Sequence, residues 1–463
     1  MSKKLCLTSL ALAMVAPIGA LADTPPSVAA EIQSLRQEIE VMRASYEARL
    51  QAMEQRLQAS GRLGADPAPT AAAQAAPTAA PKTAAAGAPA NAFNPAISLI
   101  LAGTYTQTSL DPAGYHLSGF QVPAGSQAGP GSRGFGLGES ELGLAASIDP
   151  WWRGAISLAL HPDDTVSVEE AYVQTTSIGH GLTLKAGRFL SGIGYLNSLH
   201  AHVWDFVDNP LAYQALLGTQ YSDDGLQLRW LAPTDQYLEL GAELGRGSGF
   251  PGSDTGRNGA GMSALTAHTG GDIGDSHNWR AGLSLLSAKA ADQGLSALDA
   301  TGGMVSNAFS GSTRVWLLDG VWKWAPNGNA SQTSFKLQGE YLRSSRSGSL
   351  SYDVNAANLT DAYSAVQSGW YLQGIYQFMP RWRLGLRTEQ LNPGTPDYGI
   401  NATALAGNGY RPSRNTLMLD FSPSEFSRVR LQLAQDKSRE GMTDQQLFLQ
   451  YQMSLGAHGA HGY

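Results

Sequence analysis

Guanidinium side chains recur at alternate positions near the end of this 463-residue chain, where they could form a charged wall. Between residues 381 and 455, four runs alternate apolar and polar side chains. The polar positions of two runs carry Arg381, Arg383, Arg387, Arg428 and Arg430. Such a row predicts either a surface that attracts small anions or a set of charges paired with acidic residues elsewhere.

Further charged residues have the same parity within their own runs. Lys336 would extend the basic arc, and Glu139, Glu141 and Glu169 would form an acidic arc from the earlier runs. Two opposed arcs around an aqueous channel create a transverse field, which orders water and favours charged or dipolar solutes. The density of the basic arc favours small anionic solutes, and mutual pairing of these charges is the alternative.

Four histidines stand at spacings that could suit a metal ion. His200 and His202 are two residues apart, and His458 and His461 are three apart. Imidazole is a common ligand of zinc, copper and nickel. Spacing alone does not join these pairs into one site, and ordinary polar residues of a loop and a tail are the alternative. We therefore expect no cofactor and keep the four histidines only as candidate ligands.

A period of two predicts extended strands that have one apolar and one polar face. Because the polar face carries arginines and no helices are available to cover the apolar face, the pattern favours an all-β, transmembrane antiparallel β-barrel. We expect about 16 strands in residues 93–463, including a weak one at Met262–Thr269 that an even strand number requires. A soluble β-sandwich or propeller is the alternative.

The segment Leu190–Asp224 is too apolar and aromatic for a free surface loop. We expect it to fold into the barrel and to narrow the lumen, with His202, Asp205 and Asp208 at the constriction; an ordered extracellular loop is the alternative. Residues 287–312 and 391–413 are rich in Gly, Ser and Asn and are predicted to be long loops.

Composition narrows the function. Charged residues make up 15% of the chain, below the ~25% usual in globular proteins. The net charge of −7 argues against nucleic-acid binding. The one cysteine, Cys6, lies in the expected signal peptide, which excludes cysteine chemistry in a mature chain. No Gly-x-Ser-x-Gly sequence occurs, and the glycines at Gly134–Gly138 precede no helical pattern, so no enzyme is predicted.

Three segments precede the expected barrel. Residues 1–22 have the charged start, apolar core and small-residue cleavage site of a signal peptide. Residues 23–58 contain a heptad seam with Ile32 and Ile39, which predicts a periplasmic coiled coil and allows a homotrimer. A single helix lying on the barrel is the alternative. Residues 59–92 are an Ala/Pro-rich linker.

Several stretches resemble a proteobacterial outer-membrane porin-like family whose members are sometimes labelled zinc-regulated or TonB-dependent receptors. The matching stretches are Asn94–Leu99, Gly138–Leu142, Val168–Tyr172, Lys185–Phe189 and His200–Ala215. The architecture is also similar to phosphate-selective and dicarboxylate porins, which carry a coiled coil before a trimeric barrel. The sequence departs from a TonB-dependent receptor because no plug-sized segment precedes the barrel.

These observations predict a Gram-negative outer-membrane porin, in contact with lipid, for passive and partly selective uptake of small hydrophilic solutes. A zinc- or metal-linked uptake receptor and a non-conducting structural envelope protein are the alternatives.

Overall fold

The computed structural model describes residues 95–126, 128–253, 259–405, 407 and 409–456. The expected signal peptide, coiled coil and linker (1–22, 23–58 and 59–92) lie outside the described residues, as do His458 and His461. Among the described residues, no helix is both long enough and apolar enough to cross a membrane.

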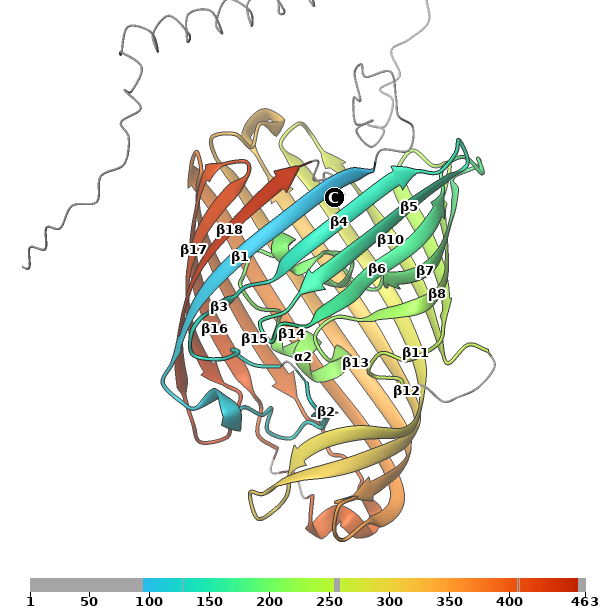
Figure 1. Ribbon diagram of the computed structural model, residues 1–463, viewed down its shortest axis with the longest axis vertical. Helices are drawn as coiled ribbons and strands as arrows, with labels where there is room; N and C mark the ends of the chain where they lie inside the picture. The colour runs from blue at the N-terminus through green and yellow to red at the C-terminus, as the bar shows by residue number, and fades with distance from the viewer. Residues whose placement is uncertain (1–94, 127, 254–258, 406, 408, 457–463) are drawn as a thin grey trace, which may run out of the picture. The chain divides into compact units, whose positions relative to one another are not determined.

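The described chain forms one antiparallel sheet that closes on itself (Figure 1). Its strands are β1 (Ala96–Thr108), β2 (Val122–Pro123), β3 (Gly134–Leu137), β4 (Ser140–Ser147), β5 (Trp152–Leu160), β6 (Val166–Thr175), β7 (Leu182–Leu190), β8 (Ser222–Leu231), β9 (Tyr237–Gly245), β10 (Met262–Ile273), β11 (His277–Leu298), β12 (Met304–Trp324), β13 (Ser334–Tyr352), β14 (Leu359–Met379), β15 (Trp382–Asn392), β16 (Ser413–Ser424), β17 (Ser427–Lys437) and β18 (Asp444–Gly456).

Each wall strand pairs with its neighbour along the chain, and β1 pairs with β18 to close the barrel. Strands β3 and β4 both pair with β1 and act as one interrupted wall strand, whereas β2 is a two-residue addition to β11. The wall therefore has 16 strands, and the predicted barrel is confirmed, including the weak strand at Met262.

The prediction of a long loop is wrong for one of the two segments, residues 287–312. Residues 287–312 are mostly strand, because β11 and β12 continue as a hairpin that turns at residues 299–303. Strands β13 and β14 also run further than the sequence suggested. These extensions consist mainly of Ala, Ser and Gly, whose alternation has too little contrast in polarity to reveal a strand.

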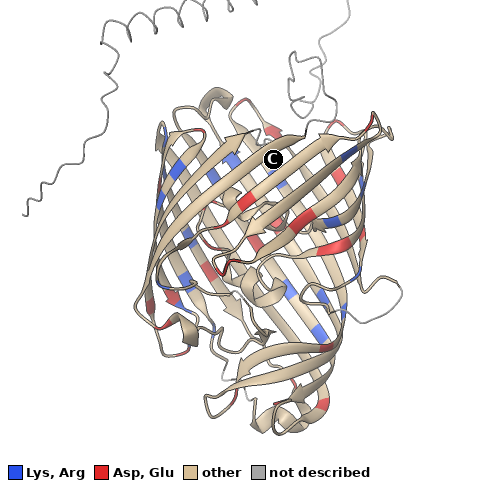
Figure 2. Cartoon of the chain, viewed as in Figure 1, with Lys and Arg blue, Asp and Glu red and all other residues tan. Residues whose placement is uncertain are grey.

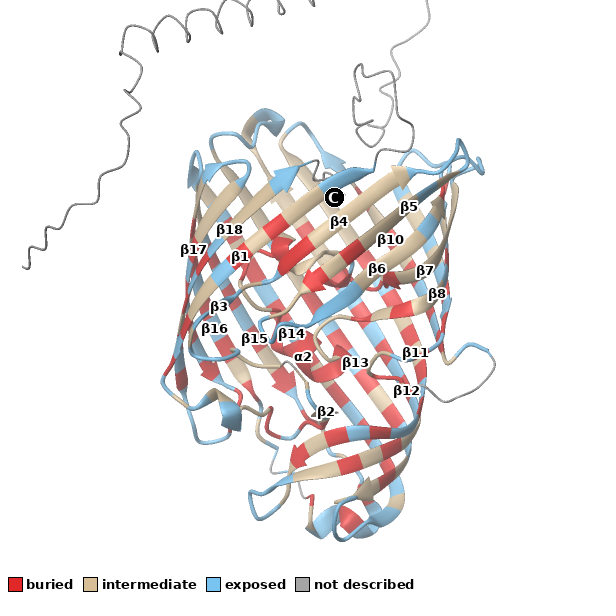
Figure 3. Cartoon of the chain, in the orientation of Figure 1, coloured by how far each residue is buried: buried red, intermediate tan, exposed pale blue. Residues whose placement is uncertain are grey.

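Burial alternates along the strands (Figure 3). On β15, Leu384 and Leu386 are exposed on the outer face, while Arg387 and Glu389 are buried inside. The same pattern leaves leucine, valine, tryptophan and tyrosine exposed outside on β8 to β18. An apolar outer face around a polar interior is the reverse of a soluble protein and suits a barrel in a bilayer.

The two ends of the barrel differ. At one end the turns are short, as at residues 380–381 and 425–426, and β1 begins and β18 ends there. Outward aromatic rings gather near this short-turn end, where Trp382 lies 4.5 Å from Phe421 between ring centroids and Trp322 lies 5.9 Å from Phe335. At the long-loop end, residues 109–133, 191–221 and 393–412 connect the strands. Short turns, long loops and an aromatic girdle are typical of outer-membrane barrels.

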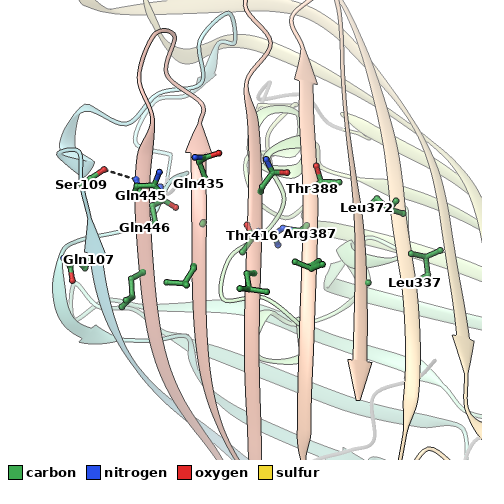
Figure 4. A pocket seen from close by; sticks show the side chains of 17 residues that line it. Gln107, Ser109, Leu337, Leu372, Arg387, Thr388, Thr416, Gln435, Gln445 and Gln446 are labelled. Carbon is green, nitrogen blue, oxygen red and sulfur yellow. Dashed lines mark hydrogen bonds between the residues drawn. The ribbon is translucent and has the colours of Figure 1, made fainter. Parts of the chain in front are cut away.

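A groove of about 800 Å³ crosses the outer face from β1 and β18 to β13 (Figure 4). Leucines line it, and a row of polar side chains borders it toward the long-loop end, where the Gln445 amide donates to Ser109 Oγ at 2.8 Å. The lining residues are Gln107, Ser109, Leu337, Leu372, Gly374, Leu386, Arg387, Thr388, Asn415, Thr416, Leu417, Leu433, Ala434, Gln435, Gln445, Gln446 and Leu447. This row marks one edge of the apolar band on these strands.

Candidate channel interior

The connection between β7 and β8, residues 191–221, lies inside the barrel; we call it the inward segment. It contains two short 3-10 turns, Leu196–Ser198 and Ala201–Val203, and the helix α2 (Leu211–Leu217). Pro210 fixes the extended backbone immediately before α2, and Gly218 ends the helix at φ 68°, where a residue without Cβ is favoured. Every residue of α2 is buried.

Wall residues on many strands hold the inward segment. Glu243 of β9 accepts from the Gly192 amide at 2.8 Å, and Ser284 of β11 accepts from the Gly194 amide at 3.1 Å. On β17 and β18, Arg428 and Gln452 both donate to the His202 carbonyl, at 2.9 and 3.1 Å. Because these strands lie around the whole circuit of the wall, the segment must lie across the interior.

An apolar cluster fixes the part of the segment that contains α2. Leu211, Leu216 and Leu217 pack with inward side chains of β11 to β15, including Leu317 and Leu342. Burying one such leucine contributes roughly 1.5–3 kcal/mol.

Glu340 lies at the edge of this apolar cluster and accepts hydrogen bonds from four donors, two backbone amides and two tyrosine hydroxyls. Its carboxylate accepts from the Leu196 amide at 2.8 Å, from the Tyr213 hydroxyl at 2.8 Å and from the Tyr371 hydroxyl at 2.7 Å. The Tyr195 amide adds a longer contact of 3.3 Å. Apolar packing and these hydrogen bonds together hold one conformation of the segment.

Two arginines, Arg387 and Arg414, form ion pairs with Asp208; we call this group the arginine clasp. The Asp208 carboxylate lies 2.8 Å from Arg387 Nη2 and 2.6 Å from Arg414 Nη1, and it also accepts from Gln432 Nε2 at 2.8 Å. Both guanidinium groups also contact Glu389, at 2.9 and 2.8 Å. Burial disfavours the charged carboxylate, but Arg414 and Arg387 outweigh that effect and lower the pKa of Asp208 below its usual value.

Asp205, three residues earlier in the chain, is held in a similar way. It pairs with Lys336 and with Arg383, whose Nη1 lies 3.2 Å from Asp205 Oδ1. Burial again opposes the charge, yet these cations hold the pKa of Asp205 well below its usual range. Arg383 also reaches Asp420 at 2.6 Å, and Arg430 reaches the same carboxylate at 3.2 Å. The row of wall arginines therefore contacts acidic residues of both the wall and the inward segment.

A polar cavity of about 330 Å³ remains between the inward segment and the wall. Lys323, Lys336 and Arg383 contribute cations to it from β12, β13 and β15, and Asp205 contributes a carboxylate. Trp204 and Tyr195 provide aromatic surface from the inward segment. Three cations around one carboxylate leave the cavity with a positive formal charge.

Imidazoles and carboxylates meet on the opposite flank of the inward segment. His200 Nδ1 lies 2.9 Å from Glu169 Oε2 and 3.3 Å from Glu141 Oε2, and His202 Nδ1 lies 2.9 Å from the same Glu141 oxygen. His200 Nε2 lies 3.1 Å from Glu170 Oε2. Burial lowers the pKa of His200, but these hydrogen bonds outweigh it and hold the pKa well above its usual value. Figure 2 shows acidic residues in red on the strands of the wall that face the viewer, β4 and β6 among them.

The structure separates the residues expected at the constriction into two interior groups and two single positions. Arg383, Arg387, Arg430 and Lys336 lie inside, in contact with Asp205, Asp208 or Asp420. Glu141, Glu169 and His202 lie together on the β4–β6 side, and Arg428 faces the His202 carbonyl. Glu139 lies at the interruption between β3 and β4. Arg381 differs from the others because β15 begins one residue later, so Arg381 lies in the β14–β15 turn instead of the wall. Its side chain is exposed, and its backbone has a positive φ of 71°.

Sequence reasoning missed several of the interior residues. Arg414 and Glu389 share the parity of predicted inward residues but lie beyond the strand ends that the sequence suggested. Glu170 points inward together with Glu169 because of a β-bulge, where Ser157 pairs with Glu170 and Leu158 pairs with Val168. Strict alternation cannot reveal a bulge.

Comparisons with known proteins give relatives of this chain. The search of family models found no match. Among solved structures, the chain is similar to a loop-deletion mutant of OmpT from Vibrio cholerae, with a TM-score of 0.49 and 11% identity, covering 78% of this chain and 99% of that one. It is also similar to the outer membrane channel DcaP of Acinetobacter baumannii, with a TM-score of 0.47, 11% identity and coverage of 78% and 97%. A third is the anion-selective porin from Comamonas acidovorans, with a TM-score of 0.48, 11% identity and coverage of 78% and 99%.

One relative is close enough in sequence to define a family. An uncharacterized protein of Aquifex aeolicus is 31% identical over 405 residues, which cover 80% of each chain. The present chain belongs to the same family as that Aquifex aeolicus protein.

Proposed function

We propose that this protein is an outer-membrane channel through which small hydrophilic solutes diffuse passively, with a preference for anions. The observation that carries the proposal is the closed barrel with an apolar outer face, a charged interior and a segment laid across that interior. A wall of 16 strands encloses a water-filled channel unless something fills it. Here the inward segment narrows the passage and leaves polar space beside it.

The anion preference is supported by the cavity beside the inward segment. Lys323 and Lys336 approach it from adjacent strands, and Arg383 approaches it from β15. A solute that carries a carboxylate or phosphate would be attracted to this positive region, and a cation would be repelled.

Planar-bilayer recording of the purified full chain tests both parts of the proposal. We expect stable channel conductance and a reversal potential in a salt gradient that indicates chloride over potassium. Lys323→Glu reverses one charge at the cavity and should move the reversal potential toward cation selectivity. Lys289→Glu, an exposed outward position on β11, is the matched control and should leave it unchanged.

The outcomes separate the two parts. Membranes that show no conductance above background would refute the channel and favour a structural envelope protein. A conducting channel whose reversal potential is the same in wild type and Lys323→Glu would refute the anion preference only. Liposome swelling with sugars, phosphate and dicarboxylates then defines the size and charge of the permeating solutes.

We also propose a homotrimer, with the short-turn end and residues 23–58 in the periplasm. The heptad seam through Ile32 and Ile39 supports self-association, and the short turns support the orientation. Native mass spectrometry in detergent should give three chains for the mature protein, and a lower order after deletion of residues 23–58. A monomeric mature protein would contradict this assembly.

A metal-linked uptake receptor is the second candidate function. The specific observation that favours it is the cluster of Glu141, Glu169, His200 and His202. Uptake of labelled zinc into proteoliposomes, compared with uptake of a neutral sugar of similar size, would distinguish selective transport from general diffusion.

A further inference from the structure

We propose that Glu141, Glu169, His200 and His202 bind one divalent first-row transition-metal ion, such as Zn²⁺, between the inward segment and the β4–β6 wall. The proposal rests on the positions of these side chains alone and is independent of whether the barrel conducts. Its four ligands come from three elements that are distant in sequence: β4, β6 and the 3-10 turn Ala201–Val203 with the residue before it.

Three of the four candidate ligands already lie close enough together to share one ion, and Glu169 contacts one of them, His200. The candidate donor atoms of Glu141, His200 and His202 all lie within 4.8 Å of one another. His202 Nδ1 and Glu141 Oε2 are 2.9 Å apart, and His200 Nδ1 is 3.3 Å from that oxygen and 2.9 Å from Glu169 Oε2. In a tetrahedral site with bonds of about 2.0–2.1 Å, the ligand atoms are separated by about 3.3–3.4 Å. Small rotations of Glu141, His200 and His202 would therefore be enough to place them around an ion, and a rotation of Glu169 toward them would add the fourth ligand.

A second layer of contacts orients the ligands. Glu170 Oε2 lies 3.1 Å from His200 Nε2, so it can accept a hydrogen bond from the N–H group at that position and leave Nδ1 for the metal. Ser157 donates to Glu141 Oε1 at 2.6 Å, which fixes the carboxylate and keeps Oε2 toward the imidazoles. The Leu190 amide donates to Glu170 at 3.0 Å. Metal-ligating histidines commonly have such a carboxylate on the other ring nitrogen.

The backbone is also adapted to the cluster. Glu169 is the extra residue of the bulge in β6, which lets both Glu169 and Glu170 reach His200 from one strand. Regular alternation would turn one of them toward lipid. Bulges frequently re-aim side chains beside functional sites.

Charge and ligand type define the class of ion. Three carboxylates gather around two imidazoles, and a dication would offset much of the negative charge. Two nitrogen ligands favour zinc-like ions over Mg²⁺ and Ca²⁺, which prefer oxygen ligands. The side chains are 3–14% exposed, so the cluster is shielded but not sealed.

A bound ion would join the inward segment to the wall on the flank opposite the arginine clasp. Asp205 and Asp208 are held by arginines of β15 and β16, whereas the metal would hold His200 and His202 against β4 and β6. Metal binding should therefore stabilise the position of the segment and reduce its fluctuations.

Equilibrium dialysis of the full chain in detergent tests the proposal. The reference protein carries His458→Ala and His461→Ala, so that the tail histidines do not bind the probe. Against micromolar Zn²⁺ in millimolar Mg²⁺ and Ca²⁺, we expect about one zinc per chain. Adding His200→Ala and His202→Ala should abolish retention, whereas His277→Ala, at the short-turn end of β11, should leave it unchanged.

A more conservative substitution keeps the test decisive if the histidine variants fail to fold. Glu141→Gln keeps the size of the side chain and should weaken zinc binding at least ~10-fold, while Ser157→Ala should weaken it by roughly 10-fold through lost orientation. Heat-modifiable migration on gels reports whether each barrel is folded. Co²⁺ in place of Zn²⁺ should give the intense visible absorption of a four-coordinate site, and Glu141→Gln should alter it.

Three results would overturn the proposal. The first is a folded reference protein that retains no zinc, the second is equal retention by the folded Glu141→Gln or double-histidine variants, and the third is displacement of zinc by equimolar Mg²⁺ or Ca²⁺. None of these results depends on conductance, so they leave the proposed channel unaffected.

Discussion

Asp208→Asn should increase the fraction of molecules in which the inward segment has left the wall, and the increase should be larger than for substitution of an exposed acidic residue. The side chain contacts Arg387 and Arg414, whose side chains are both 1% exposed, and the substitution would leave two buried guanidinium groups with one fewer carboxylate. Removing one partner of a buried ion pair costs about 3–5 kcal/mol. Glu389 still contacts both arginines, so we expect the lower end, about 3 kcal/mol.

This loss of free energy determines how many molecules have a released inward segment, which can be measured. Each 1.4 kcal/mol is a factor of ten, so about 3 kcal/mol should raise the fraction of released segment by roughly 100-fold. Hydrogen exchange in detergent measures this directly on the amides of α2, which lose protection when the segment leaves the wall. The amides of β15 and β16 should change much less, because the barrel ladder remains paired.

Asp235→Asn is the matched control, since Asp235 is an exposed acid in the short turn between β8 and β9. Its α2 amides should exchange as in wild type. Equal exchange of α2 in wild type and Asp208→Asn, with both barrels folded, would refute the idea that the arginine clasp holds the segment.

Two further predictions concern the wall and the clasp. Leu318→Arg places a charge on the exposed apolar band of β12 and should destabilise the barrel by about 2–4 kcal/mol in lipid vesicles. Ser347→Arg, also outward but on the extension of β13, should cost less than half as much in the same denaturant titration; equal losses would argue against a lipid-facing band. Glu389→Gln and Asp208→Asn should be non-additive by roughly 0.5–3 kcal/mol in unfolding free energy, because both carboxylates share the same two arginines, and simple additivity would contradict that sharing.

Much of the barrel could be predicted because its determinants are local. On β15, the alternation of Leu384 and Leu386 with Arg383 and Arg387 defines both faces of the strand without any knowledge of its neighbours. The hairpin of β11 and β12 beyond residue 287 lacks this contrast, since its inner and outer faces both carry small residues. There the pairing is specified by the continuing backbone ladder, which no local pattern encodes.

The interior could be predicted only in part because its contacts are long-range. The pattern indicated that Leu190–Asp224 is too apolar for a free loop, but nothing near Asp208 indicates Arg414, some two hundred residues later. The cluster at His200 likewise depends on a bulge in β6 that brings Glu169 and Glu170 to the same face. Spacing suggested histidine pairs, whereas the structure joins His200 and His202 to carboxylates of β4 and β6.

The pairing of charges changes what the arginines imply about selectivity. Six cations line this side of the interior, Arg383, Arg387, Arg414, Arg428, Arg430 and Lys336, and five acids contact them, Asp205, Asp208, Glu389, Asp420 and Asp436. The net formal charge of this group is therefore close to zero, and its field on a passing ion is weak. Any anion preference must then depend on the local excess of positive charge at the cavity, which Lys323, Lys336, Arg383 and Asp205 line, rather than on the number of arginines. The arginines act chiefly on the inward segment, so replacing one of them should change how strongly that segment is held in the barrel more than the sign of any ion preference.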